Sequence, residues 1–316
     1  MKIENLAFLQ PLAPGIWLAN GPAGARFPHC NGFLLAGERT VLIDAGIGPQ
    51  RIKSIDERLP IDTLIISHSH PDHILAWHAL ADRELLLPAQ TSEAVEDLRL
   101  LGQRFVSGRR DAEYWTHVVQ DRLGIHPLRP PDGRFADGGI LDLGFLQLQA
   151  IHAPGHLDDH YCFLEIASGT LFSIDIDFTG FGPWYGNPEG DIERFRESVQ
   201  MLRGLPFSRI CSSHKAPIAG EEVQTAFDSF LDAFERQRTL VFELCRQGAS
   251  LEEMVKHSPF YRNRMPDGTL QQIFETQMIR KNLDLLIRDK RIVEEGGRFR
   301  WNDGIITPTK IKKYEG

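Results

Sequence analysis

The sequence has few cysteines, no long apolar run and no excess of positive charge. Its four cysteines lie far apart and form no Cys-x-x-Cys pair, which argues against a disulfide framework and against a cysteine-based zinc site. No stretch approaches the roughly 18 apolar residues that would span a bilayer, and the first residues lack the apolar core of a signal peptide. We therefore expect a cytoplasmic protein with no membrane partner.

The overall charge is acidic, with a net charge of -8 at pH 7. This disfavours a protein whose whole surface binds nucleic acid or anionic lipid. One region differs: residues 280–316 carry ten Lys or Arg against six Asp or Glu. The composition, 42% hydrophobic and 25% charged over 316 residues, is ordinary for a globular chain of one large core plus a smaller appendage.

Five short β-rich apolar runs end on a metal-capable side chain, and they are the main signal of the first 220 residues. If such strands lie side by side, their last residues meet in one cleft, where α/β folds usually keep their chemistry. The runs end at Asp44, His68, His156, Asp175 and His214.

The densest of these signals is "HSHPDH" at residues 68–73. Neutral imidazoles and carboxylates are the usual ligands of zinc and similar divalent metals. His68 and His70 can converge on one ion from a looping backbone, while Asp72 and His73 reach a second ion from the start of a helix. Pro71 suits the first turn of that helix, and the apolar spacing predicts that it continues to Ala81. Unpaired, four such groups would be costly to bury, and bound metal compensates that cost.

In order and approximate spacing, several pieces resemble the metallo-β-lactamase superfamily over about residues 15–220. The resemblance implies an α/β fold, a four-layered αββα sandwich with a two-metal site at one edge of the sheets. The pieces are "IDAG" (43–46), "HSHPDH" (68–73), "APGH" (153–156), "FSID" (172–175) and "SSH" (212–214).

The same resemblance assigns the ligands. It implies that Asp175 bridges the two metals, that Asp44 orients ligands by hydrogen bonding, and that Ile174 stands where the family commonly has Gly. We expect two zinc ions, with iron or manganese as alternatives. The first metal would be held by His68, His70 and His156, and the second by Asp72, His73 and His214.

The complete set of seven ligands resembles the hydrolase branch of the family, which includes glyoxalase II-like thioesterases, lactonases and ribonuclease-like members. We expect a metal-bridging hydroxide to cleave a small-molecule ester, lactone or thioester. Asp72 would pass a proton, and Tyr185 would hydrogen-bond the leaving group or oxyanion. The aromatic residues around Tyr185, in "IDFTGFGPWYGNPEGD", either form an apolar substrate wall or pack the loop onto the domain.

Beyond residue 220 the pattern becomes mostly helical and ends in "EEGGRFRW", which predicts a winged-helix-like hairpin. We therefore expect a catalytic domain over residues 1–220 and a C-terminal domain over 221–316. Because the C-terminal end is basic, a metal-dependent nuclease is the alternative function, and a metal-binding protein without turnover is a third. Residues 91–123 look helical, and the insertion at 104–124 either caps the cleft or forms a homodimer. The Pro and Gly content of residues 126–139 predicts a loop.

Overall fold

A computed structural model of the chain describes residues 3–302. The chain divides into two compact units, Met1–Ala233 and Phe234–Gly316. The expected catalytic domain at 1–220 and C-terminal domain at 221–316 remain predictions, and each unit is described here by itself.

The first unit contains a seven-stranded sheet in chain order. Its first four strands are antiparallel neighbours, and its last four run parallel. The strands are β1 (Leu9–Ala13), β2 (Ile16–Ala19), β3 (Gly32–Ala36), β4 (Thr40–Ile43), β5 (Thr63–Ile65), β6 (Glu84–Pro88) and β7 (Gly133–Phe135).

A second, six-stranded sheet has the order β13-β12-β11-β10-β9-β8. β9 and β11 are both antiparallel to β10, and β12 is parallel to β11, so the carboxyl ends of these three strands share one edge. The strands are β8 (Ile140–Asp142), β9 (Gln147–His152), β10 (Tyr161–Glu165), β11 (Thr170–Ile174), β12 (Arg209–Ser212) and β13 (Ile218–Ala219). The five strands predicted from the apolar runs are confirmed as β4, β5, β9, β11 and β12.

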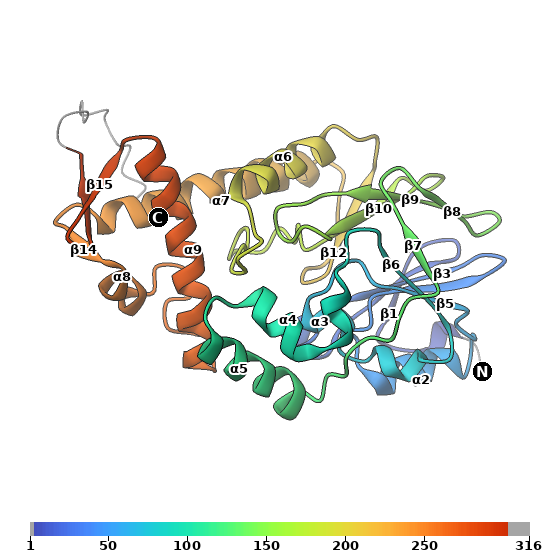
Figure 1. The fold of residues 1–316 in the computed structure, drawn as a ribbon. Helices are drawn as coiled ribbons and strands as arrows, with labels where there is room; N and C mark the ends of the chain where they lie inside the picture. The colour runs from blue at the N-terminus through green and yellow to red at the C-terminus, as the bar shows by residue number, and fades with distance from the viewer. Residues whose placement is uncertain (1–2, 303–316) are drawn as a thin grey trace. The chain divides into compact units, whose positions relative to one another are not determined.

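The main hydrophobic core is built by side chains from both sheets. Phe33 of β3 and Phe172 of β11, for example, are fully buried with ring centroids 4.7 Å apart. Helix α2 (Pro49–Asp56) covers the outer face of the seven-stranded sheet, and α6 (Ile192–Arg203) covers that of the six-stranded sheet (Figure 1). The predicted four-layered αββα sandwich is therefore confirmed.

Two local predictions need correction. The helix expected from Pro71 to Ala81 is interrupted: α3 covers Pro71–Ile74 and a 3-10 turn, η2, covers Trp77–Leu80, because Ala76 between them leaves helical geometry at φ -121° and ψ 23°. The Pro- and Gly-rich segment 126–139, expected to be a loop, contains β7, which pairs with β6.

The insertion after β6 is helical, as its sequence suggests. It consists of η3 (Glu93–Glu96), α4 (Leu98–Phe105), α5 (Arg109–His117) and η4 (Val118–Arg122). Near the N-terminus lie two short elements, η1 (Ile3–Asn5) and α1 (Pro22–Ala25).

The second unit is mostly helical, as expected. Ser250 caps α8 in a capping box with Glu253, and Gly296 and Gly297 at positive φ form the turn of the predicted hairpin. The winged-helix assignment remains a prediction. The elements are α7 (Glu222–Leu244), which crosses the boundary between the units, β14 (Ala249–Ser250), α8 (Leu251–His257), α9 (Gly268–Arg288), β15 (Ile292–Glu295) and β16 (Arg298–Trp301). Across residues 3–302, no helix combines the length and apolar composition needed to cross a membrane.

Candidate metal centre

Both sheets deliver side chains to one place. The segment that follows β5, which includes the start of α3, carries residues 68–73, while His156, Asp175 and His214 follow β9, β11 and β12. The seven predicted ligands form two groups, and within each group the ligand atoms lie within 4.8 Å of one another. The first group is His68, His70, His156 and Asp175; the second is Asp72, His73 and His214.

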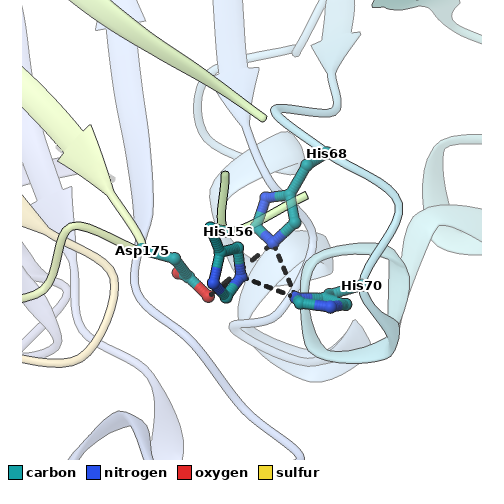
Figure 2. Close-up of side chains that lie close together, drawn as sticks. All are labelled: His68, His70, His156 and Asp175. Carbon is teal, nitrogen blue, oxygen red and sulfur yellow. Dashed lines mark hydrogen bonds and ion pairs between the residues drawn. The ribbon is translucent and has the colours of Figure 1, made fainter. Parts of the chain in front are cut away.

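Three imidazole nitrogens meet in the first group (Figure 2). Nδ1 of His70 lies 3.0 Å from Nε2 of His68 and 2.9 Å from Nε2 of His156. These distances are hydrogen-bonding distances, so the position of each proton decides whether the contacts are favourable.

The outer nitrogen of each ring fixes those protons. His156 donates from Nδ1 to the carbonyl of Trp184 at 2.8 Å, and His70 donates from Nε2 to Oδ1 of Asn187 at 2.6 Å. Ser67 gives its hydroxyl proton to Asp44, so its oxygen accepts from Nδ1 of His68 at 3.0 Å. Because a neutral imidazole has one N–H, all three inward nitrogens present lone pairs to one another.

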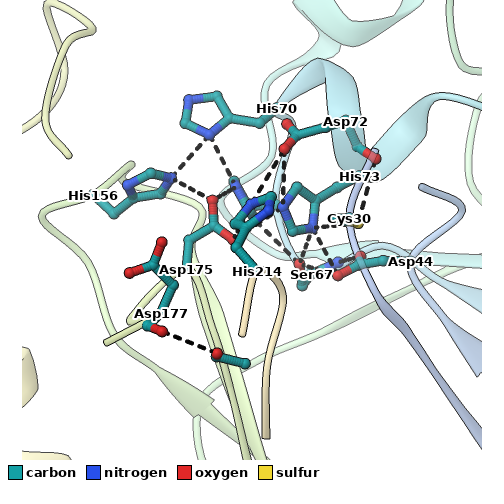
Figure 3. A network of polar contacts seen from close by, with 12 residues as sticks. Cys30, Asp44, Ser67, His70, Asp72, His73, His156, Asp175, Asp177 and His214 are labelled. Carbon is teal, nitrogen blue, oxygen red and sulfur yellow. Dashed lines mark hydrogen bonds and ion pairs between the residues drawn. The ribbon is translucent and has the colours of Figure 1, made fainter. Parts of the chain in front are cut away.

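The second group follows a similar rule (Figure 3). His73 donates from Nδ1 to Oδ2 of Asp44 at 2.8 Å, and His214 donates from Nδ1 to the carbonyl of Ala25 at 2.6 Å. Their Nε2 atoms therefore point inward. Nε2 of His214 lies 3.4 Å from Oδ2 of Asp72.

Asp175 lies between the two groups. Its Oδ2 is 3.2 Å from Nε2 of His156 and 3.7 Å from Nε2 of His68. Its Oδ1 is 3.1 Å from Nε2 of His73 and 3.6 Å from Nε2 of His214. Each carboxylate oxygen thus faces one group, which is the geometry that a bridging ligand needs.

These residues fit two divalent cations. Nε2 of His73 and Oδ1 of Asp175 are buried and lie 3.1 Å apart, yet neither makes a hydrogen bond of suitable geometry within residues 3–302. Inward lone pairs and carboxylate oxygens repel one another unless a positive charge lies between them, and imidazole and carboxylate donors suit borderline divalent metals.

The electrostatics agree with that fit. Burial lowers the pKa of His68 well below its usual value and that of His70 to about 3, so both rings are neutral at pH 7 and ready to bind metal. Burial alone would raise the pKa of Asp175, but the charges of His73 and His214 lower it well below its usual range, so the carboxylate is ionised. Burial would lower the pKa of His214, but Asp175 raises it well above its usual value, so metal binding there displaces a proton.

Other buried groups hold the ligand residues in place. Asp44 accepts hydrogen bonds from the Ser67 backbone, the Ser67 hydroxyl and His73, so it contacts one of the candidate ligands; its orienting role remains a prediction. Gly46, shortly after β4, allows the backbone to approach residues 71–73 closely, because a Cβ at this position would overlap the carbonyl oxygen of Asp72. His160 accepts from the Asp175 backbone N–H at 3.2 Å and donates to Ala153.

In the aromatic loop after Asp175, some side chains pack the loop onto the domain and others lie near the histidines. Phe178 packs on Phe227 and Phe230 with ring centroids 5.0 and 5.3 Å away. Trp184 is half-buried and lies 5.2 Å from the ring of His70. Tyr185 is fully buried, so its hydroxyl meets a substrate only if this loop moves, and its catalytic role remains a prediction. No sequence pattern pointed to Asn187, a polar residue in a Gly- and Pro-rich loop.

A family model for the metallo-β-lactamase superfamily matches residues 25–214. The hydroxyacylglutathione hydrolase of Xylella fastidiosa strain M12 is 24% identical over 256 residues, covering 78% of this chain and 83% of that protein. A β-lactamase-like protein 2 homolog of Drosophila melanogaster is 29% identical over 166 residues, 50% of each chain.

Solved structures share the fold. A metallo-β-lactamase family protein of Thermus thermophilus aligns with a TM-score of 0.73 at 19% identity, covering 92% of this chain and all of that one. A β-lactamase domain protein of Burkholderia ambifaria aligns with a TM-score of 0.69 at 19% identity, covering 93% of each chain. With the family match over more than half of its length, the chain belongs to the metallo-β-lactamase superfamily and is a metal-dependent hydrolase.

Proposed function

We propose that the protein is a dinuclear-metal hydrolase that cleaves a small-molecule thioester, ester or lactone. The observation that carries the proposal is the pair of Asp175 oxygens, one facing each histidine group. The chemistry that two bound divalent cations supply is activation of a shared water as nucleophile and polarisation of the acyl oxygen. Thioesters come first because several relatives are hydroxyacylglutathione hydrolases.

The residues of the chain have separate tasks in this proposal. The imidazoles hold the cations through lone pairs whose direction is fixed by their outer hydrogen bonds. Asp175 keeps the two positions at a fixed separation. Asp72, which is 6% exposed and within 3.4 Å of His214, accepts a proton from the attacking water and passes it to the departing sulfur or oxygen. No Ser or Cys nucleophile is needed.

We propose zinc as the metal, with iron or manganese as alternatives, because the ligands are imidazoles and carboxylates without thiolate. Cys30 does not change this choice. Its Sγ contacts the Asp72 carbonyl at 3.4 Å, and burial raises its pKa to about 11, so it stays a neutral thiol that packs behind the centre.

Phosphodiester cleavage is the competing activity. It would require the C-terminal unit to hold nucleic acid, yet Arg298 of its hairpin pairs with Glu253, and Arg300 pairs with Glu295. Such pairing lowers the positive charge that phosphate binding uses. The basic residues beyond 302, which contribute to the predicted positive tail, lie outside the described residues.

The test combines metal analysis with a substrate panel on the same sample. We expect two equivalents of divalent metal per chain and saturable release of thiol or acid from thioesters, esters or lactones. Asp175→Asn should lower kcat/KM at least about a thousand-fold, which corresponds to about 4 kcal/mol, with an unchanged circular dichroism spectrum. A metal-loaded protein that hydrolyses none of these acyl compounds but binds and cuts RNA in a salt-dependent manner would replace the proposal with the nuclease.

A further inference from the structure

Asn187 connects a proposed metal ligand to helix α4. Its side chain is 1% exposed and lies in the loop between β11 and α6. Oδ1 is 2.6 Å from Nε2 of His70, and Nδ2 donates to the backbone carbonyl of Phe105, the last residue of α4, at 2.8 Å. The amide of Asn187 therefore links His70 to the end of α4 through one hydrogen bond to each.

The orientation of this amide follows from its two partners. The Phe105 carbonyl can only accept, so the NH2 group of Asn187 faces it and the amide oxygen faces His70. That oxygen needs a donor, which is the Nε2–H of His70. The lone pair of His70 is then on Nδ1, the atom that meets His68 and His156.

His70 differs from its neighbours in this respect. His68 and His156 present Nε2 to the centre, whereas His70 presents Nδ1. Without an acceptor beyond the ring, the Nε2–H of His70 would be a buried donor without a partner, which is unfavourable, or the ring would turn and withdraw Nδ1.

We propose that Asn187 is a positioning residue that fixes the tautomer and ring orientation of His70 for metal binding. The inference rests on the proposed metal centre. Replacing the residue that hydrogen-bonds the outer nitrogen of a metal-binding histidine typically weakens metal affinity about 10–100-fold. The second hydrogen bond of Asn187 does separate work, since it holds the end of α4 beside the loop, where the ring of Phe105 lies 5.4 Å from that of His70.

Two variants separate these tasks. Asn187→Asp keeps an acceptor for His70 but loses the donor to Phe105, and Asn187→Leu loses both. Zinc affinity of the metal-free protein is measured by competition with a chromogenic chelator. We expect Asn187→Leu to bind zinc about 10–100-fold more weakly and Asn187→Asp to stay within about threefold of the wild type. The matched control is Asn282→Leu, which removes another buried amide, in α9, and should leave zinc affinity unchanged.

A measurement on the wild type guards against variants that fail to fold. Nitrogen-15 NMR of the metal-free protein should show His70 protonated on Nε2 and not on Nδ1. The proposal is overturned if the proton is on Nδ1, if Asn187→Leu binds zinc as tightly as the wild type, or if Asn187→Asp is as weak as Asn187→Leu. None of these readouts measures turnover, so a failed substrate panel would remove the proposed hydrolase and leave this test intact.

Discussion

At the scale of single residues, the centre depends on which nitrogen of each imidazole carries the proton. The outer nitrogen of each ring donates to an acceptor, such as the Trp184 carbonyl for His156 or the Asp44 carboxylate for His73, so the other nitrogen is the one that faces the centre. The proposed ligands are thus arranged before metal arrives, and we expect the groups behind them to contribute to affinity without contacting the metal.

Asp44→Asn tests this at the second group. The carboxylate accepts three hydrogen bonds, from the Ser67 N–H, the Ser67 hydroxyl and His73, whereas an amide must turn its NH2 toward one of those donors. We expect affinity for one of two zinc ions to fall about 10–100-fold, so that dialysed protein retains one equivalent. Asp62→Asn, which changes a carboxylate bound to the Thr40 N–H, is the control. Retention of both ions by Asp44→Asn would contradict the assignment.

Ile174 carries backbone strain beside the centre. It sits at φ 53° directly before Asp175 and its side chain is fully buried in the core. The left-handed conformation costs a branched residue about 1–2 kcal/mol, but deleting a buried aliphatic side chain costs about 2–5 kcal/mol. We therefore expect Ile174→Gly to lower the free energy of unfolding by about 1–3 kcal/mol in urea titrations. An increase in stability would mean that strain, and not packing, dominates here.

At the scale of elements, helix α4 is fastened at its C-terminal end. Arg104, on the last turn, pairs with Asp158 at 2.7 Å and with Glu189, and these acidic residues lie on the loops that carry His156 and Asn187. The insertion is therefore attached to the loops around the candidate metal centre. Its two alternative roles, capping the cleft or forming a homodimer, both remain predictions.

Arg104→Gln should loosen this attachment. The Arg104 side chain is 16% exposed, so its ion pairs are shielded from water. Its replacement leaves Asp158 and Glu189 without this partner. We therefore expect the backbone amides of α4 to exchange hydrogen at least about tenfold faster, which corresponds to a local opening free energy lower by about 1.4 kcal/mol. Arg99→Gln is the control, because Arg99 is 79% exposed and pairs with Asp97 at the start of the same helix. Equal exchange in both variants would show that the ion pairs do not hold the helix.

In the second unit, Glu275 of α9 holds the segment after α8. Its carboxylate accepts from the Phe260 N–H, the Tyr261 N–H and the Ser258 hydroxyl. We expect Glu275→Gln to lower the unfolding free energy by about 1–3 kcal/mol at pH 7, read as faster hydrogen exchange over residues 258–288.

The pH dependence of this difference has a definite sign. Burial raises the pKa of Glu275 above its usual value, against the opposing hydrogen bonds. The folded state then holds this proton more tightly than the unfolded state, so the contribution is full below about pH 4.5 and declines as pH rises through the folded pKa. The advantage of the wild type over Glu275→Gln should therefore grow as the pH is lowered from neutral toward the usual glutamate pKa of 4.5; a constant difference would show that Glu275 does not titrate in this range.

At the scale of the whole molecule, we expect metal binding to contribute a large part of the free energy of unfolding. A ligand at about a thousand times its Kd stabilises the folded state by about 4 kcal/mol per site. Two such sites contribute about 8 kcal/mol, so chelation should lower the thermal midpoint of the first unit by roughly 15–30 °C, and zinc should restore it. An unchanged midpoint in the chelated protein, with metal loss verified by elemental analysis, would contradict a structural contribution from the metals.

The parts of the fold that follow local sequence patterns could be predicted from the sequence. Apolar runs ending on His or Asp located the strands, and the density of "HSHPDH" located the centre. The sequence did not predict strand β7, because the pairing of β7 with β6 overrides the loop-forming composition of that segment. It also did not predict the break at Ala76, which the apolar spacing does not signal. It also did not single out Asn187 or Arg104, since a polar side chain in a loop or helix has no distinguishing pattern until its partners are known.

The ligands of the centre are divided between the two sheets, with residues 68–73 on one and His156, Asp175 and His214 on the other. Neither sheet can complete a binding site before it has met its counterpart. We therefore expect metal to bind after the two sheets have packed together, so that a bound cation adds a cross-link between their strand ends to the hydrophobic core that already joins them.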